Sequence, residues 1–483
     1  MIEDKLKPKG SKLLEVRQGI TFEPGHGDFK YRIETYIFSP VSLHINSQTF
    51  KPHDCLHLFR NYLRLRSPNL PLESLASSQE IKDRFGAVID ELGTAQEPDA
   101  PSRYKKHLRT YTATFVHSLH VYSNSMIRDE EFTEAFIRNF VEMLRKAREV
   151  YKKEMPRLAE LDKKFRTGCS KFCDEYMTDI SLNVVQDIVS KLEPGPRRDI
   201  LIAFWNEENA WRLKMHPESE ALEENAADKN LYRYRLLSKY VECYLFLNIH
   251  AHTEPTLLVH SLYGLAAALS MIFATVVAFV WQGEYGSLSW NLFVALVIAY
   301  IFKDRFKALL QQEFSTKFKK WIPDRRLEIY LNDEAKVGKC SESFSFVDLR
   351  QLPERIRELR QKYQTVKGIY NWRFENILVY KKEMTIHRNP RYFNDARYAL
   401  LDTTWINLEP FLTFIDAKQA RVPVAGSAIE KPPYGEKYYH IYLVRSTTTY
   451  DKSGKKFNTR DEVTRIAVDY QGIRSVEVIN TGS

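Results

Sequence analysis

An uncharged stretch just past the middle of the chain constrains the fold more than any other feature. Residues Leu257 to Trp281 hold no Asp, Glu, Lys or Arg over about 25 positions, whereas a helix that crosses a bilayer needs roughly 20 apolar residues at about 1.5 Å each. The alternative is a buried helix of a soluble domain, but uncharged runs beyond about 18 residues are rare there. The stretch therefore predicts a transmembrane helix.

A second apolar run follows closely, from Leu288 to Phe302. It is shorter than a full span, so the stem of Lys303 would have to complete it while its ammonium group reaches the headgroups. Gly283 and Gly286 lie between the two runs and break the helix. We predict a two-helix transmembrane hairpin over residues 256–302.

The distribution of basic residues predicts the orientation of this hairpin. Cytoplasmic flanks carry the excess of Lys and Arg, and such residues precede the first run and follow the second. We therefore expect both termini in the cytoplasm, the hairpin in the inner (cytoplasmic) membrane and only the turn outside. The charged N-terminal sequence MIEDKLKPKGSK predicts no signal peptide.

Residues 303–326 predict a basic amphipathic helix that lies in the membrane interface. Phe306, Leu310, Phe314 and Phe318 recur at helical spacing. Packing of this helix on the C-terminal domain is the alternative. The residues expected at the interface, with anionic headgroups as their partner, are Lys303, Arg305, Lys307, Lys317, Lys319, Lys320, Trp321, Trp281 and Trp290.

Small and amide side chains in the hairpin suggest helix packing. Gly264, Ala268 and Ala274 would allow helices to approach closely, and Asn291 could face a shared axis in a homo-oligomer. The same residues also suit packing of the two helices within one chain. None of them is a fixed charge that would mark a transport pathway.

The rest of the chain predicts three further units. Residues 1–102 read as an α+β segment, because GDFKYRIETYIFSP at 27–40 alternates as a half-buried strand before Pro40. Residues 103–255 read as a cytoplasmic helical bundle, in which Pro156 kinks or divides a helix and LYRYRLLSKYVECYLFLNIHA leads to the bilayer. Residues 327–483 read as an α+β domain with mainly antiparallel strands.

Two groups of residues could hold a metal ion. His53 and His57 are four apart around Cys55, but no further ligands are evident. Cys169 and Cys173 are also four apart, without the CxxC spacing of a zinc or redox motif, so we expect one thiol to be buried and the other exposed. The sequence predicts no metal site and no cofactor.

Asp324, Glu334 and Lys336 loosely follow the metal-binding arrangement of many nucleases. A solvated turn at NDEAK is the simpler interpretation. Phosphate-binding loops, nucleophile elbows and kinase motifs are not found, so the sequence offers no reason to expect an enzyme.

The net charge of +9 does not predict nucleic acid as a partner, because much of the excess lies near the membrane, where anionic lipid is closer. The five cysteines are odd in number, and cytoplasmic exposure would keep them reduced. Large soluble units on a small anchor favour an oligomeric, membrane-anchored sensor or scaffold with a cytoplasmic protein partner. The alternatives are a membrane-perturbing effector, as in bacterial anti-phage defence, and a membrane-tethered nuclease.

Overall fold

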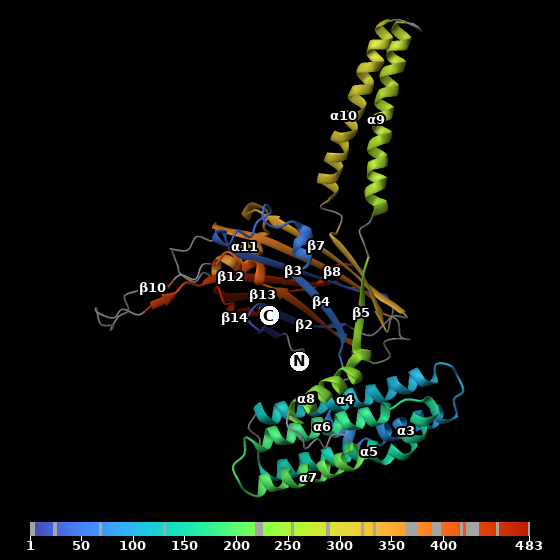
Figure 1. Ribbon diagram of the computed structural model, residues 1–483, viewed down its shortest axis with the longest axis vertical. Coiled ribbons are helices and arrows are strands. Elements are labelled where there is room, and N and C mark those ends of the chain that lie inside the picture. The colour runs from blue at the N-terminus through green and yellow to red at the C-terminus, as the bar shows by residue number, and fades with distance from the viewer. Residues whose placement is uncertain are drawn as a thin grey trace.

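The computed structural model shows a mixed architecture of helices around one large antiparallel sheet (Figure 1). It describes residues 5–481 except 23–26, 67–69, 129–131, 218–225, 253–255, 286–289, 320–322, 332–334, 364–373, 389–397, 416–418, 422–433 and 451–453. The strands follow the order β1-β2-β9-β4-β5-β6-β7-β8-β3-β12-β13-β14. Their bounds are β1 Lys5–Lys9, β2 Leu13–Phe22, β3 Gly27–Pro40, β4 Phe59–Leu65, β5 Phe246–His252, β6 Arg325–Leu331, β7 Ala335–Val347, β8 Glu375–Arg388, β9 Tyr398–Asn407, β12 Tyr439–Tyr450, β13 Lys456–Val468 and β14 Ile473–Thr481, and the short strands β10 Gln419–Arg421 and β11 Tyr434–Glu436 pair separately.

Strand β3 shows how the alternating pattern becomes structure. The strand predicted at 27–40 is confirmed, and it ends at Pro40 because proline has no amide donor for the ladder. Ile33 and Ile37 face the interior of the curved sheet, whereas Phe38 packs on the outer side with the short helix α11, Glu354–Lys362. Both faces of this strand are therefore covered at its second half.

The strands of the two chain ends belong to one sheet, which corrects the predicted separation of 1–102 from 327–483. β9 pairs with both β2 and β4, and β3 lies between β8 and β12. Alternation identifies the buried face of a strand but not its partner, so the sequence pattern could not join these ranges. The helical bundle and the hairpin are inserted between strands of this single β unit.

The two edges of the sheet approach each other. The Ile473 amide donates to the Ser11 carbonyl at 2.6 Å, which ties the β13–β14 turn to the β1–β2 turn. Gly472 makes this contact possible: its φ is +142°, and a Cβ at this position would lie 2.1 Å from the same carbonyl oxygen. The sheet therefore curls around an interior.

The helices that lie in and around the predicted range 103–255 pack together, and the first of them begin before residue 103. The members of this helical bundle are α2 Leu72–Ser77, α3 Gln79–Thr94, α4 Ala100–Arg128, α5 Glu134–Phe165, α6 Cys169–Val189, α7 Pro196–Met215 and α8 Ala226–Glu242. They share one apolar core. Helix α5 runs through Pro156 without ending. Inside the core, the buried Arg148 of α5 pairs with Asp174 of α6 and Glu208 of α7 at 3.0 and 3.3 Å.

The last helix of the bundle is shorter than predicted. Helix α8 ends at Glu242, and Phe246–His252 forms strand β5 in place of the expected helix end. Residues Leu247 to His252 of β5 pair with β6, and the buried Leu247 contributes to the sheet interior. Tertiary pairing overrides local helix propensity at this segment.

Two long antiparallel helices, α9 Thr256–Tyr285 and α10 Trp290–Lys319, project from the β unit on the side opposite the bundle (Figure 1). Within the described residues, only α9 is long and apolar enough to cross a membrane, over Tyr263–Val280. The structure thus shows one candidate span and not the predicted pair at 256–302. The predicted boundary at residue 303 is also wrong, because α10 continues from the apolar run into the basic segment as one helix.

Candidate membrane-inserting hairpin

Helix α9 exposes apolar side chains along its length. Only 11% of the Tyr263–Val280 window is buried within the structure. Ile272 is 59% exposed and Val276 is 54% exposed. A core helix of a soluble protein would bury most of such a window, whereas the described residues leave the window of α9 largely uncovered.

Contacts between α9 and α10 fix the register of the hairpin. The rings of Phe273 and Phe306 lie 5.4 Å apart, and Ala266, Ser270 and Ala299 are buried. The Ser270 hydroxyl donates to the Ala267 carbonyl at 2.8 Å, so this polar group is satisfied within its own helix. These small residues bring the two helices together.

One side of the hairpin carries a groove of about 400 Å³. We call this side the groove face. Its lining residues are Met271, Ala274, Thr275, Ala278, Phe279 and Gln282 from α9, and Leu296, Ala299, Tyr300 and Lys303 from α10. The Lys303 ammonium lies 4.4 Å from the centre of the Tyr300 ring, which is a cation–π contact.

Exposed aliphatic and aromatic residues that do not line the groove form a second surface, which we call the apolar face. It consists of Leu269, Ile272, Val276 and Val280 on α9 and Ile298, Phe302 and Leu309 on α10. Successive members are three or four residues apart on α9 and four or seven apart on α10, which places them on one stripe per helix. The two faces differ in chemistry: the groove face combines small and polar residues with the large Met271, Phe279, Leu296 and Tyr300, whereas the apolar face holds only large aliphatic and aromatic residues.

The residues predicted to pack helices differ in where they lie on the hairpin. Ala274 lines the groove, whereas Gly264 and Ala268 are exposed, and a Cβ at Gly264 would meet no atom within 4 Å. Asn291 belongs to α10, but its side chain lies outside the described part. The contact residues Ala266 and Ser270 were missed, although their four-residue spacing beside Phe273 is a signal that could have revealed them.

The predicted interface residues lie mainly on these two helices. Trp290 begins α10 and is 75% exposed, and Trp281 is in the last turns of α9. The three basic residues Lys303, Arg305 and Lys307 occupy the middle of α10, and Lys317 and Lys319 its last turn. Lys320 and Trp321 lie outside the described residues.

The hairpin is attached to two neighbouring strands. β5 precedes α9 and β6 follows α10, and the two strands pair antiparallel from Leu247–Leu331 to His252–Arg326. In contrast, β4 and β5 pair only at Leu63–Leu247 and Arg64–Phe246. A groove of about 440 Å³ opens there, lined partly by Asn248 and His250 of β5. Any molecule in this groove would contact the strand that leads into α9.

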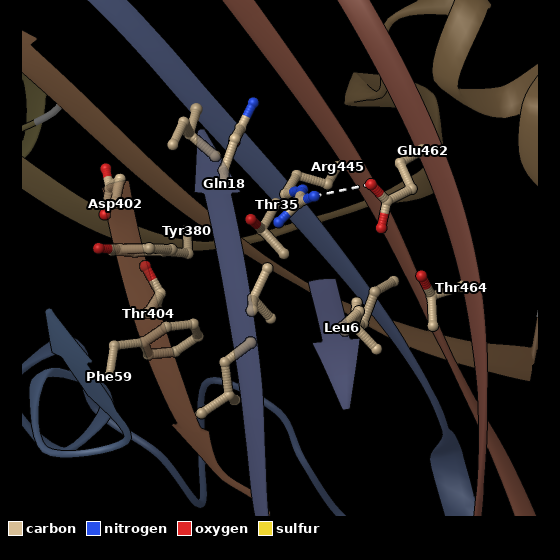
Figure 2. A pocket seen from close by; sticks show the side chains of 14 residues that line it. Leu6, Gln18, Thr35, Phe59, Tyr380, Asp402, Thr404, Arg445, Glu462 and Thr464 are labelled. Atoms are coloured by element: carbon tan, nitrogen blue, oxygen red, sulfur yellow. Dashed lines mark hydrogen bonds and ion pairs between the residues drawn. The ribbon is translucent and has the colours of Figure 1, made fainter. Parts of the chain in front are cut away.

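The interior of the β unit contains a band of buried polar side chains between two apolar clusters (Figure 2). The Lys382 ammonium donates to the Asp402 carboxylate at 2.5 Å and to the Asn61 side-chain carbonyl at 3.0 Å. The Tyr31 hydroxyl donates to the other Asp402 oxygen at 2.8 Å. These bonds join β3, β4, β8 and β9 across the interior.

A second part of the band contains Arg445, Glu462 and Tyr380. Arg445 pairs with Glu462 at 2.7 Å, as the dashed line in Figure 2 marks, and Tyr380 donates to Glu342 at 2.7 Å. The free cavity among these side chains is about 20 Å³, room for roughly one water molecule. The interior is a packed, mutually bonded core in this conformation and not an open ligand site.

The predicted nuclease residues are not brought together. The Asp324 carboxylate accepts the Phe344 amide at 2.7 Å, next to the start of β6. Lys336 pairs with Tyr330 near the other end of that strand, which places it about 20 Å away at 3.3 Å per residue. Glu334 lies outside the described residues. The strand between the two residues separates them.

The cysteine and histidine pairs resemble no closed metal site. No group of three or more potential ligands occurs in the described residues. Cys169 and Cys173 are both buried with their sulfurs 4.0 Å apart, so the expectation of one exposed thiol is wrong. Burial raises the pKa of the Cys173 thiol. His57 is exposed in the turn that follows the short helix α1, Pro52–Leu56, while Cys55 of that helix is buried in the core.

Comparison of the chain with protein-family models, with curated proteins and with solved structures gives no match.

Proposed function

We propose that this protein is a membrane-anchored sensor or scaffold whose α9–α10 hairpin crosses the bilayer. The observation that carries the proposal is the exposed apolar surface of α9. Burying a side chain such as Ile272 or Val276 contributes about 1.5–3 kcal/mol, and α9 exposes several of them over the length of a membrane span. A bilayer is the environment that covers such a surface along a helix.

The position of the hairpin supports separate roles for the hairpin, as membrane anchor, and for the helical bundle, as the part that contacts a partner. The hairpin and the bundle project from opposite sides of the β unit (Figure 1), so a bilayer around the hairpin would leave the bundle free to contact a cytoplasmic protein. The basic residues that flank both helices favour a cytoplasmic location for both termini in this arrangement. Anionic headgroups of the inner membrane would then meet Lys317 and Lys319.

The connection between bundle and hairpin supports a sensing role. Arg233 of α8 bonds to the buried Glu175 of α6, and Glu242 at the end of α8 pairs with Arg64 of β4 at 3.0 Å. The chain then passes through β5 directly into α9. A partner bound at the bundle or in the β4–β5 groove would therefore act on the strand that holds the hairpin.

One observation favours the membrane-perturbing effector as a second candidate. Arg305 and Lys307 flank Phe306, whose ring contacts Phe273 in the apolar window of α9. Charges at this depth disturb a bilayer unless protein or water surrounds them. Induced expression of the full chain should depolarise cells under this alternative, whereas a passive anchor leaves the membrane potential unchanged.

The test of the proposal compares the full chain with a variant that lacks the hairpin. A short Gly-Ser loop replaces residues 254–322, and because β5 and β6 are antiparallel neighbours, the loop closes an ordinary β-hairpin. The full chain should float with vesicles and resist extraction by alkaline carbonate. The variant should remain in solution with the circular dichroism of a folded α+β protein. Release of the full chain by carbonate would refute the proposal.

A further inference from the structure

The charged residues of α10 lie level with the middle of the apolar window of α9. The Phe273–Phe306 contact sets this level. Phe273 is about 15 Å from Tyr263 and about 10 Å from Val280 along the helix at 1.5 Å per residue. Arg305 and Lys307 are adjacent to Phe306, and Lys303 is one turn closer to the tip of the hairpin.

Lipid tails offer no hydrogen-bond or ion-pair partners to Lys303, Arg305 and Lys307. A bilayer placed over the α9 window covers Lys303 on every side that α9 leaves open, and a lysine stem reaches only about 6 Å toward the headgroups. A shallower insertion that keeps Lys303 at the surface leaves Leu265 and Leu269 of α9 in water, although they are exposed and apolar. Neither placement suits a single hairpin.

Contact through the groove face would give Lys303 of α10 polar surroundings while the apolar residues of α9 stay in lipid. Lys303 lines the groove together with the polar Thr275 and Gln282, the small Ala274, Ala278 and Ala299, and the large residues named above. Interfaces between membrane helices are enriched in such small and polar residues, because they allow close approach and hydrogen bonding away from lipid. The apolar face, with Ile272, Val276 and Phe302, suits contact with acyl chains.

We propose that the groove face of the hairpin binds the hairpin of a second copy of this chain within the membrane, so that Lys303 is enclosed by protein and the apolar face meets lipid. This inference rests on the membrane location proposed above. A second copy is the occupant because every copy carries Lys303 at the level of its apolar α9 window. Symmetric association would shield this lysine from lipid in all copies at once. Asp304, next to Lys303, supplies an opposite charge at the same level.

Adjacent residues at matched depth test this inference. In a Cys243→Ser background, which removes the exposed cysteine, Thr275→Cys places a thiol in the groove and Val276→Cys places one on the apolar face. Membranes that contain the full-length variants are oxidised with copper phenanthroline at several ratios of protein to lipid. Thr275→Cys should give disulfide-linked dimers at a yield that dilution in lipid does not reduce, at least tenfold above Val276→Cys.

Each other outcome decides against the inference. Cross-linking of Val276→Cys alone would place the interface on the apolar face and overturn it. Cross-linking of neither variant, or of both in proportion to protein density, would show hairpins without a specific contact, and the membrane anchor would survive if carbonate still fails to extract them. Extraction of both variants and of the parent by carbonate would defeat the anchor and the association together.

Discussion

Removing the ammonium group of Lys382 tests whether the buried polar band stabilises the β unit. Lys382 and Asp402 are both buried, with 2.5 Å between the ammonium and the carboxylate. Lys382→Met keeps the apolar stem but leaves the Asp402 carboxylate with the Tyr31 hydroxyl and no opposite charge. Loss of one partner of a buried ion pair costs about 3–5 kcal/mol, so we expect the free energy of unfolding to fall by about this amount.

Urea unfolding of the detergent-solubilised protein, followed by tryptophan fluorescence and circular dichroism, measures this loss. Arg465→Met is the matched control, because Arg465 and Glu477 form an ion pair on the surface of the same sheet, where such pairs contribute about 0–1 kcal/mol. The double variant Lys382→Met, Asp402→Leu should recover most of the stability, since it buries no unpaired charge. A loss for Lys382→Met no larger than that of the control would refute the reasoning.

Three further predictions follow from other parts of the structure. Gly472→Ala should lower the thermal unfolding midpoint, because a Cβ there would collide with the Ser11 carbonyl, whereas Gly86→Ala, with no atom within 4 Å in helix α3, should leave it unchanged or raise it. Burial raises the pKa of Asp179 to about 6 from its ordinary value of 3.8, so the folded state binds this proton more tightly than the unfolded state and loses stability as the pH rises from about 4 to 6. Asp179→Asn should therefore gain stability relative to the wild type over that pH range. Equal shifts of the thermal unfolding midpoint at pH 4 and pH 7 would contradict this prediction. A peptide of residues 303–326 should bind anionic vesicles with a blue shift of its Trp321 emission, and changing Lys317, Lys319 and Lys320 to Glu should weaken this binding by at least about 3 kcal/mol; equal binding of both peptides would show that the apolar side chains dominate.

Local patterns in the sequence predicted individual elements well. The alternation of Phe29, Tyr31 and Ile33 with polar residues identified β3, and the absence of charge from Leu257 to Trp281 identified α9. In each case one signal covers the whole element: the alternation in β3 agrees with its burial pattern, and the uncharged run marks the length of α9. Interactions within an element, or with one uniform environment, are the ones that a single sequence reveals.

Pairing between distant segments could not be predicted in the same way. Nothing local to β9 indicates that it lies between β2 and β4, and the segment Phe246–His252 becomes a strand only because β6 is beside it. The polar band was missed for the same reason, since Asn61 lies 321 residues before Lys382, and the strands β8 and β9 that carry Lys382 and Asp402 do not pair with each other.

The hairpin illustrates both what local patterns reveal and what they do not. The apolar runs marked its helices, but their relative depth depends on the contact between Phe273 and Phe306, which aligns the basic part of α10 with the apolar part of α9. Counting residues in each run gave a short second span that ended at Lys303. The register instead places Lys303 beside residues of the apolar window of α9.

Labelling of single cysteines in intact cells tests the central claim most directly. In the Cys243→Ser background, Ser287→Cys lies in the segment between α9 and α10, and Lys455→Cys lies just before β13. If the hairpin crosses the membrane with both termini in the cytoplasm, a membrane-impermeant maleimide should label Ser287→Cys in intact cells and Lys455→Cys only after permeabilisation. Labelling of Lys455→Cys in intact cells, or of neither variant before permeabilisation, would contradict the account.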